Sequence, residues 1–64
     1  MKAGDLVRFR ECIWHIEPKR YTEWKVGLLV KYIPWMKIAT ILYEGEEYTV
    51  RAENTQLHKR AKRN

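Results

Sequence analysis

The segment from Lys37 to Val50, KIATILYEGEEYTV, constrains the fold of this chain more than any other. It predicts a β-hairpin closed at Glu44-Gly45, because glycine supplies the positive φ of a two-residue turn and both flanks are rich in β-branched and aromatic residues. The register that follows pairs Tyr43 with Glu46, Leu42 with Glu47, Ile41 with Tyr48, Thr40 with Thr49, Ala39 with Val50 and Ile38 with Arg51. A slip of one residue would turn the apolar face of this hairpin to water, so the register is well specified.

Two further strands are predicted before the hairpin. Residues 5–10 alternate between apolar and basic side chains, with Val7 and Phe9 on the expected core face. Residues 24–33 predict a central strand, since apolar side chains occupy both of its faces. One face is expected to carry Val26, Leu28, Val30 and Tyr32, and the other Lys25, Gly27, Leu29, Lys31 and Ile33. Gly27 within this strand indicates a bend or a bulge.

The remaining segments predict loops and a short last strand. Residues 11–23 lose alternation around Pro18, so a long loop or splayed hairpin is expected, and such loops often carry binding residues. Residues 51–55 fit a helical or 3₁₀ turn, followed by a short strand at residues 56–58 with Leu57 pointing inward. The expected organisation is one domain over residues 1–58 and a basic, disordered tail over residues 59–64.

Five short strands with a long first loop, a tight hairpin between the third and fourth strands and a 3₁₀ turn before the last strand resemble a small all-β, five-stranded SH3-like barrel. The residues are similar to the small SH3-like barrel proteins of tailed, often marine, bacteriophages, mostly of unassigned function. The matching segments are KAGDLVR at 2–8, WKVGLLV at 24–30, ILYEGEEYTV at 41–50 and the closing Leu57. That group usually has Trp in place of Tyr43 and Asp in place of Glu44, and the basic tail has no counterpart in it. The resemblance implies a fold and a phage origin, but no mechanism.

Composition narrows the function classes. One cysteine, Cys12, excludes an internal disulfide, and with only two histidines it argues against a structural zinc site. The chain has no serine, and Cys12 and His15 lack an orienting partner, so we predict no catalytic residue, no metal and no cofactor. No apolar run is long enough to span a membrane and no signal-peptide pattern opens the chain. These features predict a protein without a membrane partner or a small-molecule substrate, and the phage resemblance implies that it acts in the cytoplasm of the infected host or in the virion.

The positive charge is concentrated near the end of the chain. The formal net charge is +5, and the last six residues hold four of the thirteen basic side chains, which leaves nine basic against eight acidic residues in the rest. The candidate phosphate contacts are Arg8, Arg10, Lys59, Arg60, Lys62 and Arg63. The strand arginines alternatively belong to an ordinary solvated face, with glutamates pairing across strands.

Aromatic residues are the candidates for partner binding. They are Trp14, Tyr21, Trp24, Tyr32 and Trp35, in or beside the two loops that flank the groove of an SH3-like barrel. Such rings can line a surface for an extended peptide, a cation or a stacked base, or they can cap the open ends of a small core. We expect a non-enzymatic module that binds a protein partner or its own copies, and alternatively a nucleic-acid-binding protein that uses the basic tail.

Overall fold

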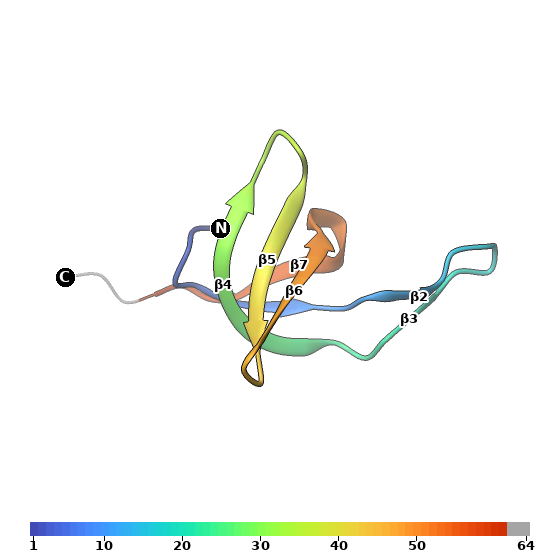
Figure 1. Ribbon diagram of the computed structural model, residues 1–64, viewed down its shortest axis with the longest axis horizontal. Helices are drawn as coiled ribbons and strands as arrows, with labels where there is room; N and C mark the ends of the chain where they lie inside the picture. The colour runs from blue at the N-terminus through green and yellow to red at the C-terminus, as the bar shows by residue number, and fades with distance from the viewer. Residues whose placement is uncertain (62–64) are drawn as a thin grey trace.

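The computed structural model describes residues 1–61 as a small all-β domain (Figure 1). Its elements are β1 Leu6–Phe9, β2 Cys12–Trp14, β3 Arg20–Tyr21, β4 Lys25–Ile33, β5 Ile38–Tyr43, β6 Glu46–Arg51, the 3₁₀ turn η1 Ala52–Asn54 and β7 Thr55–Lys59. Five strands form one antiparallel sheet in the order β6-β5-β4-β1-β7, and β2 pairs with β3 in a separate two-stranded ribbon.

The β5–β6 hairpin has the predicted register at all six pairs, from Tyr43 opposite Glu46 to Ile38 opposite Arg51. Both turn residues have positive φ, 49° at Glu44 and 79° at Gly45. This is the geometry whose backbone twist matches that of the flanking strands, and it is easy for glycine but strained for glutamate.

The core lies on one face of the sheet. Its buried residues are Val7, Phe9, Leu29, Ala39, Ile41 and Val50, with Tyr32, Tyr43 and Tyr48 packed against them. The ring of Phe9 meets Tyr43 edge-on at 5.6 Å and Tyr48 at 5.7 Å between centroids. Burial of its ring, followed by the nearby carboxylate of Glu46, raises the pKa of Tyr48.

The central position predicted for residues 24–33 is confirmed, because β4 is the middle strand of the sheet. The predicted division of its faces is wrong beyond Leu29. A bulge between Leu29 and Lys31 shifts the alternation, so that Tyr32 joins Leu29 on the core face while Val26, Leu28 and Val30 stay exposed. A strict period of two cannot anticipate one inserted residue.

Gly27 marks a close approach of strands rather than the bulge itself. A Cβ at this position would lie 2.6 Å from Cγ2 of Ile41 and 2.8 Å from the carbonyl oxygen of Leu42. Those distances are far inside van der Waals contact, so the packing of β4 on β5 depends on the missing side chain.

Both ends of the described chain meet at Asp5, which is buried. Its carboxylate accepts hydrogen bonds from the backbone N–H of Lys2 at 2.9 Å and of Ala61 at 2.9 Å. The last strand is longer than predicted and ends at Lys59, which pairs with Leu6. Lys59 therefore belongs to the sheet and not to the tail, whereas the predicted tail residues Lys62 and Arg63 lie outside the described residues.

The expectation of an all-β domain with a 3₁₀ turn before the last strand is confirmed. Over residues 1–61 the sheet is open, since no ladder joins its two edge strands, β6 and β7. Of the two alternatives predicted for residues 11–23, a long loop or a splayed hairpin, the structure shows the hairpin: β2 and β3 pair in a ribbon that extends away from the sheet (Figure 1).

Candidate functional site: an exposed arm and the cleft beneath it

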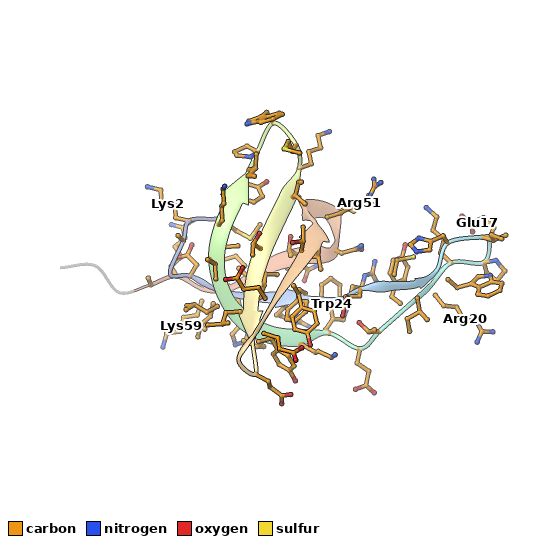
Figure 2. All side chains as sticks on the ribbon, viewed as in Figure 1. Lys2, Glu17, Arg20, Trp24, Arg51 and Lys59 are labelled. Atoms are coloured by element: carbon orange, nitrogen blue, oxygen red, sulfur yellow. The ribbon has the colours of Figure 1, made fainter. Side chains whose placement is uncertain are left out.

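The most prominent feature outside the sheet is the arm, defined here as residues 12–21, which comprise β2, β3 and their connecting tip. It accounts for the elongated shape of the molecule, 45 × 26 × 18 Å (Figure 1). Glu17 and Arg20 lie at the far end of the arm, and Trp24 lies near its base (Figure 2).

The arm is anchored at its base by paired hydrogen bonds. The N–H of Thr22 donates to the carbonyl of Glu11 at 2.8 Å, and the N–H of Glu11 donates to the hydroxyl of Thr22 at 2.9 Å. One residue earlier, the backbone N–H and the Nε of Arg10 both donate to Asn54 of η1, at 3.0 and 3.3 Å. The direction of the arm is therefore fixed where it leaves the sheet.

Beyond this base the arm turns large apolar side chains toward solvent. Ile13 is 62% exposed, Trp14 53% and Ile16 70%. Within the described residues, no hydrogen bond joins residues 13–19 to the five-stranded sheet. A cluster of large apolar side chains on a protruding ribbon is typical of a surface that another molecule covers.

A cleft of about 380 Å³ separates the arm from the end of the sheet. The arm contributes Cys12, His15, Lys19 and Tyr21, and the opposite wall is formed by β6 and η1. The basic groups lining it include Arg10, Lys19 and Arg51, and the acidic ones are Glu11 and Glu53. These side chains can bind polar and acidic groups of a partner. The residues that line the cleft include no pair of buried titratable groups.

Two arginines and two aromatic rings form a stack at the base of the arm. The guanidinium carbon of Arg10 lies 3.8 Å from the ring centre of Tyr21 and 4.8 Å from that of Trp24. Arg8 lies 5.5 Å from the centre of the Trp24 ring. The order Tyr21–Arg10–Trp24–Arg8 holds each guanidinium by cation–π attraction, which fixes its orientation and covers ring surface that a base would need.

The structure brings together only some of the predicted site residues. Tyr21 and Trp24 join Arg8 and Arg10 in the stack, while the remaining candidates lie elsewhere. Trp14 lies on the arm, Tyr32 packs against the core, and Trp35 is 83% exposed in the turn between β4 and β5. The five aromatic residues predicted in or beside two loops therefore lie in four different places and not along one surface. Lys59 lies on the side of the sheet away from the arm (Figure 2), so it does not extend the arginine pair into a stripe.

Sequence reasoning missed Ile13 and Ile16 as surface residues. The stretch CIWHI looks like a continuation of the first strand, which would have buried alternate members of it. The signal that could have found them is Pro18 followed by two basic residues, which marks the tip of a ribbon too narrow to bury either face.

Two other classes of site are absent from the part of the chain that the structure describes. Residues 1–61 contain no group of three or more His, Cys, Asp or Glu side chains placed to hold a metal ion. They also form no helix with the length and apolar character needed to cross a membrane.

Comparison with protein-family models, with curated proteins and with solved structures finds no match to this chain.

Proposed function

We propose that this chain is a non-enzymatic binding module that acts through protein–protein contacts, with the arm as its contact element. The observation that carries this proposal is the exposure of Ile13, Trp14 and Ile16, each more than half exposed on a ribbon that the sheet does not cover. Burying such side chains against a partner is favourable by about 1.5–3 kcal/mol each, which is sufficient for specific recognition when the ribbon is already ordered.

The cleft supplies the polar part of the same surface. A partner segment lying along the arm would meet Lys19 and Arg51 on opposite sides of the cleft. Rim charges of this kind steer a partner and fix its register more than they add affinity. We therefore expect a partner that presents apolar side chains to the arm and acidic side chains to the cleft.

The fold and origin proposed with this function are those of an SH3-like barrel protein of a tailed bacteriophage. The order of elements supports this assignment: a long excursion between the first and the central strand, a tight hairpin, and a 3₁₀ turn before the last strand. A protein of that origin would act in the cytoplasm of the infected host or in the virion.

The arm is tested by photo-crosslinking in cells that express the full chain. A benzophenone side chain is placed at Ile13 in one variant and at Trp35 in a matched control, because both positions are exposed but only the first lies on the arm. We expect a discrete crosslinked protein from position 13 that disappears when Trp14→Ser is added. Equal crosslinking from position 35, or none from position 13, would contradict the proposal.

A second candidate function is nucleic-acid binding, favoured by the Tyr21–Arg10–Trp24–Arg8 stack. The Nε of Arg10 already donates to Asn54, but stacking leaves the other N–H groups of both guanidiniums pointing away from the ring faces, where they can donate hydrogen bonds to phosphates. Binding of a 30-base-pair DNA duplex would then fall by about 10³ between 50 and 200 mM salt if six phosphates are contacted. Exchanging Lys59, Arg60, Lys62 and Arg63 for glutamine should weaken it strongly, and it keeps the backbone hydrogen bond from Ala61 to Asp5. Absence of binding at low salt, or indifference to this exchange, would exclude this alternative.

A further inference from the structure

The face of the sheet opposite the core carries a row of three leucines on adjacent strands. Leu6 of β1 lies opposite Leu28 of β4, and Leu28 lies opposite Leu42 of β5. They are 38%, 39% and 38% exposed, and Val26 and Val30 flank the row on β4 with 43% and 40%. Scattered surface leucines are ordinary, but a contiguous row across three strands is not.

The row has a side chain of opposite charge at each of its two ends. Glu47 of β6 lies opposite Leu42, and Lys59 of β7 lies opposite Leu6. Read across the sheet, the order is Glu47, Leu42, Leu28, Leu6 and Lys59. We call these five residues the outer row. If a second copy of the row is laid on the first in the opposite direction, leucines meet leucines and each acidic end meets a basic end.

We propose that the outer row is a self-association surface whose occupant is a second copy of this chain. In a face-to-face dimer, a two-fold axis parallel to β4 reverses the row, which stacks Leu28 on its counterpart and places Glu47 against Lys59 of the partner subunit. A two-fold axis along the row would instead superpose like charges. The charge pattern therefore selects the first arrangement, as an isologous interface requires.

The size of the surface sets the strength of the association. Stable interfaces bury about 800 Å² on each partner, and five partly exposed aliphatic side chains offer less than that. The twist of the sheet concentrates contact near Leu28 and leaves the two charge pairs at the rim. We therefore expect a reversible dimer with a dissociation constant of about 0.1–1 mM at moderate salt.

This association does not depend on the arm. The outer row belongs to β1, β4, β5, β6 and β7, whereas the arm comprises β2 and β3. The experiment on the arm and the experiment on the outer row can therefore succeed or fail independently.

The test is sedimentation equilibrium of the full chain from 20 µM to 1 mM at 150 mM salt. The unmodified protein should show a mass that rises with concentration, and Leu28→Lys should remain monomeric throughout. Glu47→Lys and Lys59→Glu should each weaken association by about 3–10-fold, as expected for rim charges, and the double exchange should restore it. Trp35→Ser, which removes an exposed ring outside the row, is the control and should change nothing.

Circular dichroism of each variant shows whether it is folded before its mass is interpreted. A strict monomer at 1 mM would overturn the proposal and leave the row to a different partner. Association that survives Leu28→Lys, or that is lost with Trp35→Ser, would place the contact elsewhere. Two weakened single variants without rescue in the double exchange would overturn the two-fold arrangement.

Discussion

The arm and the sheet use the same kind of side chain in opposite ways. Ile41 in the sheet is 0% exposed, whereas Ile16 on the arm is 70% exposed. In the sheet, five strands curve around one apolar face and give each buried residue neighbours from several strands. A ribbon of two strands has no second layer to cover it and is at best marginally stable alone. An apolar side chain on the arm can therefore become buried only when another molecule covers it.

The difference also separates stability from recognition. The sheet is held by packing around Phe9, by the close approach at Gly27 and by the hydrogen bonds of Asp5. Within residues 1–61, hydrogen bonds hold the arm to the rest of the domain at its base alone, through Glu11, Thr22 and the Arg10–Asn54 contact. Substitutions in the core of the sheet should affect folding, and substitutions on the arm should affect binding.

Gly27→Ala should have the largest effect, because the new methyl group would overlap Ile41 and the backbone of Leu42. We expect a loss of about 3 kcal/mol or more in the free energy of unfolding, which equals most of the stability of a domain of this size. Urea denaturation followed by tryptophan fluorescence measures it. The neighbouring Val26→Ala, on the exposed face, is the control and should cost less than about 1 kcal/mol.

Asp5→Ala should be the next most damaging substitution. It removes a buried carboxylate that accepts two backbone hydrogen bonds from opposite ends of the chain. The expected loss is about 2–4 kcal/mol, because the N–H groups of Lys2 and Ala61 lose their acceptor. Asp5→Asn keeps the shape and one acceptor oxygen, so its unfolding midpoint should lie between those of the parent and the alanine variant. Equal stability of all three proteins would show that the two hydrogen bonds accepted by Asp5 do not stabilise the fold.

Glu44→Asn should stabilise the sheet. Glu44 has a φ of 49°, a conformation that asparagine adopts more easily than glutamate. An Asn-Gly turn should raise the free energy of unfolding by about 0.5–1 kcal/mol. The gain appears as a higher denaturation midpoint with an unchanged slope. Glu44→Val should lower the denaturation midpoint, because valine is branched at Cβ and adopts a positive φ with difficulty.

Replacing Ile13, Trp14 and Ile16 together by serine should change the free energy of unfolding by no more than about 1 kcal/mol, because all three side chains are already exposed. The same protein should lose the crosslinked partner. Ile41→Ala is the matched control in the sheet, where one buried isoleucine should cost about 2–5 kcal/mol. A large loss of stability in the triple arm variant would mean that the arm packs on the sheet.

The smallest expected effect is a change in stability at alkaline pH, and it comes from Tyr48 at the edge of the core. Burial and the Glu46 carboxylate favour the neutral form of Tyr48 and so raise its pKa. The stability that this contributes is complete below pH 10, the ordinary value, and is lost as the pH rises through the raised pKa. Absorbance at 295 nm should show a component that titrates above pH 10 and is absent in Tyr48→Phe. If the component lost in Tyr48→Phe titrates at or below pH 10, this assignment is contradicted.

The local sequence pattern predicted the β5–β6 hairpin fully, because a positive-φ turn at Gly45 and the alternation on both strands indicate one register. It also predicted that β4 is central, since both of its faces carry apolar residues. It failed at the bulge after Leu29, where one inserted residue changes the face of Tyr32 without any mark in the composition. Such a bulge is decided by how β4 curves over β5, which is a property of the packed sheet.

The candidate site was predicted only in part. Pro18 and the broken alternation indicated a long excursion, and Trp14 and Tyr21 were rightly assigned to it. The exposure of Ile13 and Ile16 could not be predicted, because apolar residues in a short strand usually indicate burial. The pairing of Arg10 with Tyr21 and Trp24 depends on where the arm leaves the sheet, and that direction is set by Asn54, more than forty residues away.

The separation of a stable sheet from an independent arm is tested most directly by amide hydrogen exchange of the free protein, followed by NMR. Amides of β1, β4 and β5 should be protected by about 100-fold or more, close to the value for global unfolding. Amides of residues 13–19 should exchange with almost no protection. Protection of Ile13 and Ile16 equal to that of Leu29 and Ile41 would contradict the account, because it would show that the arm unfolds only together with the sheet.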